Sequence, residues 1–109
     1  MAIKILSVDD ELDLEILLTQ YFRRKIKKGE YEFHFAHNGL EALQMLLAMP
    51  DFDVILSDIN MPEMDGLTLC QTIRNRQFGH YVYVILLTAR ENAGDLTQGF
   101  DAGADDFLS

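Results

Sequence analysis

Carboxylate and hydroxyl side chains follow directly after several short apolar stretches of this sequence. The residues concerned are Asp9, Asp10, Asp58 and Thr88. If these apolar stretches are parallel strands of one sheet, their carboxyl ends lie at one edge, where open α/β sheets bind ligands. Carboxylates crowded at such an edge raise each other's pKa unless a cation neutralises them. The pattern therefore predicts an acidic pocket that a cation or a bound proton must stabilise.

Mg²⁺ is the cation that suits this pocket, because it prefers oxygen ligands and binds through one or two carboxylates together with phosphate oxygens. Asp58 can then act as a nucleophile toward a phosphoryl group and form an aspartyl phosphate. The Thr88 hydroxyl would donate a hydrogen bond to the phosphoryl oxygens. Each residue also has a purely structural explanation, since aspartates cap helices and turns and threonine is common in strands. The chemical interpretation depends on all of them meeting at one sheet edge.

Apolar stretches of strand length alternate with amphipathic stretches of helix length along the chain. Loop residues such as Pro62, Asp65 and Gly66 separate them. We expect strands at 3–8, 31–36, 54–58, 82–89 and from 105 onward, and helices at 14–21, 40–47, 67–76 and 92–101. This alternation predicts an α/β fold in which helices cover both faces of a parallel sheet.

Apolar residues at helical spacing predict the inner faces of these helices. They are Leu14, Leu17, Leu18 and Tyr21 in the first helix, Leu40, Leu43 and Leu47 in the second, and Leu69, Cys70 and Ile73 in the third. Cys70 is expected to pack as a small apolar residue and not to act as a nucleophile. Asn38 with Glu41 predicts the N-cap of the second helix. Gly94 and Gly99 each cost about 1 kcal/mol in a helix interior, so the helix at 92–101 is expected to be the least firmly held.

Residues 23–28 form a basic run, Arg-Arg-Lys-Ile-Lys-Lys, where the first helix ends. Cations near a helix C-terminus complement the helix dipole, so we interpret the run as a solvated helix end. A docking patch is the alternative. Gly29 is a suitable helix stop.

Length and composition limit the chain to one domain and a few classes of function. It has 109 residues, 49% of them hydrophobic, one cysteine and a formal net charge of −9. The acidic balance argues against direct nucleic-acid binding and favours a metal ion or a basic partner. The chain has no apolar segment of bilayer-spanning length and no signal peptide pattern at its start, so no membrane contact and a cytoplasmic location are expected. The histidines lack the spacing of a zinc site.

The residues that suggest this chemistry also resemble a known family, the receiver domains of two-component response regulators. The matching motifs are Val8-Asp9-Asp10-Glu11, Asp58 with Met61-Pro62-Glu63-Met64-Asp65-Gly66, Leu87-Thr88-Ala89, and Gly103-Ala104-Asp105-Asp106-Phe107-Leu108. They occur in the family's order, and the resemblance covers essentially the whole chain. It implies a flavodoxin-like, doubly wound, five-stranded parallel sheet in the order 2-1-3-4-5.

The resemblance also implies a phosphorylation-dependent switch that is not a conventional enzyme. Asp58 would accept a phosphoryl group from a phosphohistidine of a sensor histidine kinase or histidine phosphotransfer protein, and an output domain or downstream protein would read the result. A dimer is a further alternative. The implied roles are Mg²⁺ binding by Asp9, Asp10, Asp58 and Asn60, switching by Thr88 and Phe107, and control of phosphoryl lifetime by Asn60 and Arg90.

One feature departs from the family pattern. Members of the family carry a lysine followed by a proline just after the Phe-Leu-Ser position, and this sequence ends at Ser109. The lysine normally pairs with the phosphoryl oxygens. The resemblance therefore implies that residues 1–109 are a C-terminally truncated receiver domain without its last helix.

Two other classes of function remain as alternatives. An Mg²⁺-dependent phosphatase with an aspartate nucleophile generally has a second aspartate two residues later as general acid, but Asn60 stands at that position and cannot donate a proton in that role. A receiver-like interaction module that has lost phosphorylation would have no affinity for Mg²⁺.

Overall fold

The computed structural model describes residues 2–59, 64–76, 78–87 and 93–108. Strands and helices alternate along these residues, as the sequence predicts. The strands are β1 (Ile3–Val8), β2 (Tyr31–Ala36), β3 (Val54–Asp58), β4 (Tyr83–Leu87) and β5 (Asp106–Leu108). The helices are α1 (Leu12–Tyr21), α2 (Arg23–Lys27), α3 (Gly39–Ala48), α4 (Gly66–Asn75) and α5 (Ala93–Asp101).

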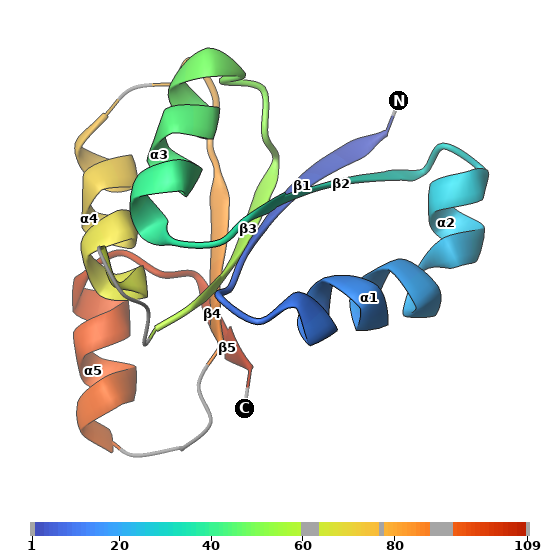
Figure 1. Ribbon diagram of the computed structural model, residues 1–109. Coiled ribbons are helices and arrows are strands. Elements are labelled where there is room, and N and C mark those ends of the chain that lie inside the picture. Colours follow the sequence, from blue (N-terminus) through green and yellow to red (C-terminus); the bar gives the residue numbers. More distant parts are fainter. Residues whose placement is uncertain (1, 60–63, 77, 88–92, 109) are drawn as a thin grey trace.

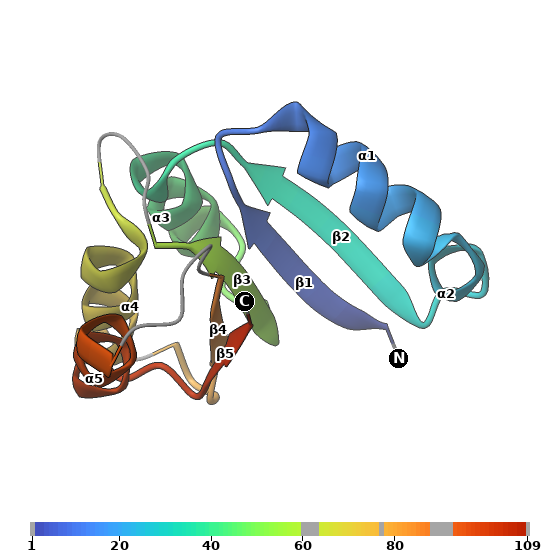
Figure 2. The same cartoon turned by 90° about the horizontal axis from the view of Figure 1, so that it is seen from below.

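The five strands form one parallel sheet in the order β2-β1-β3-β4-β5. This confirms the predicted doubly wound, flavodoxin-like order. Helices α3, α4 and α5 lie together on one face of the sheet, and α1 with α2 lies on the other (Figure 1). The view from below shows the same separation, with α2 at the end of the molecule farthest from α4 and α5 (Figure 2).

The hydrophobic core lies between the sheet and the helices α3 to α5. Every second residue of the inner strands points into it, so that Leu6, Ile55 and Leu86 are completely buried. The inner face predicted for α4 is confirmed, because Leu69, Cys70 and Ile73 are at most 2% exposed. Burial also raises the pKa of Cys70 to about 11, which keeps the thiol protonated and inert at neutral pH.

Helix α3 is rotated relative to the sequence prediction. Leu40 and Leu47 are 44% and 50% exposed, whereas Ala42 and Leu46 are completely buried, so the predicted stripe is wrong at Leu40 and Leu47. It is correct at Leu43, which packs partly buried against the core. The predicted Asn38 cap is confirmed, since its side chain accepts a hydrogen bond from the backbone N–H of the residue three positions later at 2.8 Å. The first residue of the helix, a glycine, lies against the backbone after β3, where a Cβ would overlap a carbonyl oxygen. This close approach sets the rotation of the helix.

The inner face predicted for α1 is only partly correct. Leu14 and Leu18 are half-buried, but Leu17 and Tyr21 are 63% and 79% exposed. What holds this layer to the edge of the sheet is a group of aromatic rings between the α1–α2 junction and β2. The ring of Phe22 contacts those of Tyr31 and Phe33, each with centroids 5.6 Å apart.

A second contact that the sequence analysis did not predict fixes the start of β5. The Arg74 guanidinium donates hydrogen bonds to the carbonyls of Gly103 at 2.8 Å and Val82 at 2.7 Å, and to the Asp105 carboxylate at 2.6 Å. The hydroxyl of Tyr81 donates to the same carboxylate, and the guanidinium lies over the Tyr81 ring. One arginine on α4 therefore joins β4 to the turn that precedes β5.

We expect Arg74→Ala to lower the free energy of unfolding by about 2–4 kcal/mol, because it leaves the largely buried Asp105 carboxylate without its cation. Urea denaturation monitored by circular dichroism measures the change. Arg76→Ala is the matched control, since Arg76 is exposed, and it should cost less than about 0.5 kcal/mol. Equal effects of the two substitutions would show that the Arg74 contacts do not anchor β5.

Candidate functional site

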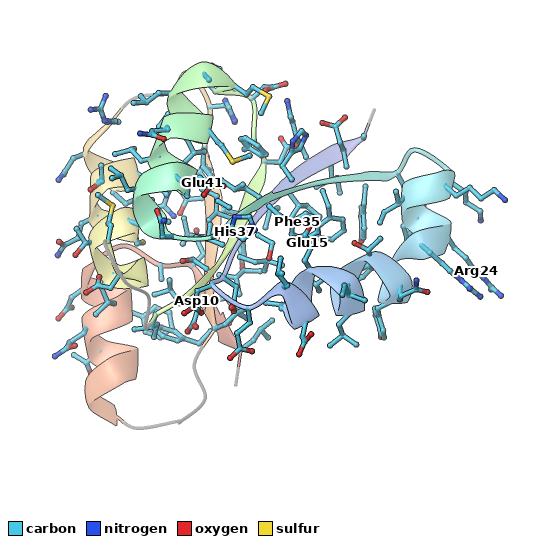
Figure 3. All side chains as sticks on the ribbon, in the orientation of Figure 1. Asp10, Glu15, Arg24, Phe35, His37 and Glu41 are labelled. Carbon is cyan, nitrogen blue, oxygen red and sulfur yellow. The ribbon has the colours of Figure 1, made fainter. Side chains whose placement is uncertain are left out.

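Parallel pairing of β1 with β3 brings the predicted aspartates together. Val8 stands opposite Ser57 in the register, so Asp9, which follows β1, and Asp58, which ends β3, lie at the same sheet edge. Carboxylate oxygens of Asp9, Asp10 and Asp58 all lie within 4.8 Å of one another. Figure 3 shows Asp10 at this edge, where β1 gives way to α1. The structure thus brings the side chains of Asp9, Asp10 and Asp58 together at this edge.

The segment after β3 turns back sharply beside Asp58. The backbone N–H of Gly66 donates to the carbonyl of Ile59 at 2.9 Å, and a Cβ on Gly66 would overlap the Asp58 carbonyl. Asp65 caps α4 by accepting a hydrogen bond from the backbone N–H of Thr68 at 2.7 Å. A glycine is therefore required where the chain returns past the strand end.

The surroundings of Asp9 disfavour its ionised form. Partial burial, and next the neighbouring Asp10 charge, raise the pKa of Asp9 above its ordinary value, although a hydrogen bond from the backbone N–H of Glu11 at 2.8 Å opposes the rise. Protonation or a bound cation relieves this strain. The Glu11 contact also holds the Asp9 side chain in one orientation.

The donor set fits Mg²⁺. Three carboxylate oxygens within 4.8 Å of one another can face a common ion, and Asp10 is exposed, so solvent can supply the waters that Mg²⁺ retains. A hard oxygen-only set of this kind favours Mg²⁺ over zinc, which takes nitrogen and sulfur ligands in closed sites. Asp9, Asp10 and Asp58 are the residues that would hold it.

Three of the predicted site residues lie outside the residues that the structure describes. They are Asn60, Thr88 and Arg90. Their assignments as metal ligand, switch hydroxyl and lifetime-tuning positions remain predictions. Thr88 directly follows Leu87, which stands opposite Asp58 in the β3–β4 register.

Phe107, the predicted aromatic switch residue, is half-buried and lies between β5 and α5. Its ring contacts that of Phe100 with centroids 5.1 Å apart. The ring also occupies the space that a Cβ on Gly99 would need. The absence of a side chain at Gly99 thus lets α5 approach β5 at this ring.

The sequence matches the response regulator receiver domain family over residues 5–109. The chain belongs to this family. Receiver domains are signalling phosphoacceptors that bind Mg²⁺ at an acidic site and are not conventional enzymes. Helices that could cross a membrane are absent from the described part of this receiver domain.

Relatives of known sequence and structure agree with the family. The response regulator MprA of Mycobacterium ulcerans is 36% identical over 108 residues, which cover 99% of this chain and 44% of MprA. This receiver domain thus spans less than half the length of the curated relatives that it matches. The chemotaxis protein CheY4 of Vibrio cholerae is 28% identical with a TM-score of 0.85, over 99% of this chain and 86% of that one.

A third relative is a solved structure that contains a metal ion. It is the receiver domain of a sensor histidine kinase from Pseudomonas aeruginosa, with a magnesium ion coordinated in its active-site cleft. It is 27% identical with a TM-score of 0.82, and the match covers 100% of this chain and 85% of that one.

Sequence reasoning missed the Arg74–Asp105 contact because its partners are 31 residues apart and no local pattern links them. The acidic pair Asp105-Asp106 at the start of β5 was a visible signal, but it also matches a family motif and a strand entry. Phe100 was missed as well. Its contact with Phe107 could not be predicted from their separation in the sequence, because the two rings meet only when α5 packs against β5.

We expect Asp9→Asn to raise the thermal midpoint in the absence of divalent cations by about 2–5 °C. A carboxylate whose pKa is raised in the folded state destabilises that state once pH exceeds the unfolded pKa, so stability falls as pH rises through the two values. The variant should also gain less than the wild type from added Mg²⁺. Differential scanning fluorimetry at neutral pH, with and without Mg²⁺, measures both effects.

Asp13→Asn provides the control for this experiment, because Asp13 is exposed and lies in the first turn of α1, where a negative charge is favourable. It should lower the midpoint slightly and leave the Mg²⁺ response unchanged. A rise equal to that of Asp9→Asn would mean that net charge, and not the carboxylate group at the sheet edge, sets the stability.

We expect Gly99→Ala to destabilise the domain by about 1–3 kcal/mol, although alanine is the better helix former, because the new Cβ would overlap the Phe107 ring. Combining it with Phe107→Leu should recover part of the loss. Urea denaturation of the single and double variants measures the coupling. Strict additivity would contradict the direct contact between α5 and β5.

Proposed function

We propose that this receiver domain is an Mg²⁺-dependent phosphoacceptor and that Asp58 takes the phosphoryl group from a phosphohistidine of a sensor histidine kinase or histidine phosphotransfer protein. The observation that carries the proposal is the grouping of the Asp58 carboxylate with those of Asp9 and Asp10 at the carboxyl edge of the sheet. This edge is where an open α/β sheet binds its ligands.

In the proposed reaction, a carboxylate oxygen of Asp58 attacks the phosphorus atom. The phosphorus–nitrogen bond breaks, and the imidazole leaves with its electron pair and takes up a proton. Asp9 and Asp10, with the backbone carbonyl of Asn60, would hold Mg²⁺, which when bound neutralises charge on the phosphoryl oxygens. The hydrogen bond from the Glu11 backbone keeps Asp9 directed toward the site. The protein thus contributes mainly positioning and electrostatic complementarity.

The acylphosphate on Asp58 would change the conformation of β4, β5 and α5. In this proposal the Thr88 hydroxyl bonds a phosphoryl oxygen, and Phe107 changes its position as the hydroxyl moves. The tight packing of the Phe107 ring against Gly99 gives the ring a direct contact with α5. Phosphorylation would then shift a two-state equilibrium that an output domain or downstream protein recognises. Residues Asn60 and Arg90 would set how long the phosphoryl group persists.

We expect Asp58→Asn to abolish phosphorylation by acetyl phosphate in the presence of Mg²⁺, because an amide cannot form the acylphosphate. Intact-protein mass spectrometry on the wild type and the variant measures the added phosphoryl group. Asp53→Asn is the matched control, since Asp53 precedes the other end of β3, and it should be labelled like the wild type. EDTA should suppress the wild-type reaction.

Three results would contradict the proposal. Undiminished labelling of Asp58→Asn would place the acceptor elsewhere. Sustained hydrolysis of a phosphate monoester would favour the phosphatase. If neither phosphorylation nor an Mg²⁺-dependent rise in stability occurs, the domain is an interaction module.

A further inference from the structure

Positive charge is concentrated at one end of a strongly acidic domain. Five of the nine lysines and arginines lie between Arg23 and Lys28, and no aspartate or glutamate occurs from Ile16 to Gly29. These residues form α2 and its flanks, which project at the end of the molecule opposite α4 and α5 (Figure 2). We call residues 17–28 the basic tip.

Most of the cations in the basic tip have no counter-charge. Lys25 pairs with Glu30 at 3.1 Å. Within the described part of the chain, no carboxylate lies within ion-pair distance of the other four, which are all exposed: Arg23, Arg24, Lys27 and Lys28. Figure 3 shows Arg24 directed away from the rest of the protein. One or two cations would complement the helix dipole, so five exceed that need.

Large apolar side chains are also exposed in the basic tip. Leu17 and Tyr21 are 63% and 79% exposed, and Arg24 and Lys28 follow them in the sequence. The helix breaks at Phe22, where φ is −100° and ψ is 17°. Helix α2 then leaves α1 at a large angle, so Leu17 and Tyr21 lie on α1, whereas Arg24 and Lys28 belong to α2 and its end (Figures 1 and 2). The Phe22 ring, which contacts Tyr31 and Phe33 of β2, also meets the Tyr21 ring edge-on with centroids 4.8 Å apart.

The acidic pocket is too distant to cancel this charge. Helix α1 has ten residues, which corresponds to about 15 Å along its axis, and α2 lies beyond its far end. Interactions between exposed charges are screened over about 8 Å at physiological ionic strength. A surface that contacts the basic tip therefore meets local positive charge, whereas Asp10 lies at the other end of α1 (Figure 3).

We propose that the basic tip binds the surface of an anionic lipid bilayer, with Arg24 and Lys28 at the headgroups and Tyr21 at the interface. A short helix projecting at one end of the molecule suits a flat, extended anionic surface better than it suits a peptide, which needs a groove. Amphipathic Tyr side chains and cations are the residues that interfacial contacts use. The contact lies on the bilayer and does not span it, and it leaves the Asp10 end of α1 accessible.

Flotation of the full chain with lipid vesicles tests the proposal. Vesicles of phosphatidylcholine with 30% phosphatidylserine, about the anionic content of a charged leaflet, are compared with pure phosphatidylcholine at low and high salt. We expect binding only to the anionic vesicles and its loss at high salt. Each cation contributes a factor of about five, so the charge reversal Arg24→Glu should weaken binding about 25-fold.

Arg76→Glu is the matched control, because it makes the same change of net charge at an exposed position on another element, and its binding should stay within about twofold of the wild type. Lys28→Glu is a second test variant, and circular dichroism confirms that each variant is folded. Absence of wild-type binding, equal binding to neutral vesicles, or equal losses in Arg24→Glu and Arg76→Glu would overturn the proposal. Salt-sensitive binding to a DNA duplex without vesicle binding would also overturn it.

Discussion

The close grouping of three aspartates is the constraint on which the site depends. Asp9, Asp10 and Asp58 hold their carboxylate oxygens within 4.8 Å of one another, and burial raises the pKa of Asp9. An isolated chain would separate these charges. The β1–β3 register keeps them together, because completely buried residues such as Leu6 and Ile55 fix the strands behind them. Packing energy thus maintains a site in which the ionised form of Asp9 is disfavoured.

The two faces of the sheet are held by different interactions. Helices α3 to α5 cover a close-packed apolar core, whereas α1 and α2 are held chiefly by the aromatic rings of Phe22, Tyr31 and Phe33 at the β2 edge. This arrangement leaves Leu17 and Tyr21 exposed beside the cations of the basic tip. The same helix layer therefore presents an acidic end at the pocket and a basic end away from it, and the two ends can contact different partners.

On the β4–β5 side of the sheet, a polar contact fixes the start of β5, and a close ring contact joins β5 to α5. Arg74 ties the start of β5 to β4 through two backbone carbonyls and the Asp105 carboxylate. Two residues later, the Phe107 ring fills the space left by Gly99 on α5. The strand is thus fixed at its start and packed against α5 near its end.

The sequence by itself determined the elements, their alternation and the three aspartates, because hydrophobic period, turn residues and family motifs are local signals. It also identified the Asn38 cap and the inner face of α4. Only the tertiary structure decided how the helices rotate against the sheet. Periodicity defines an apolar stripe, but the glycine that begins α3 lies against the backbone after β3, and this contact turned Leu40 and Leu47 outward. The Arg74–Asp105 pair likewise depends on strands meeting across 31 residues, since a long-range contact forms only when the whole sheet does.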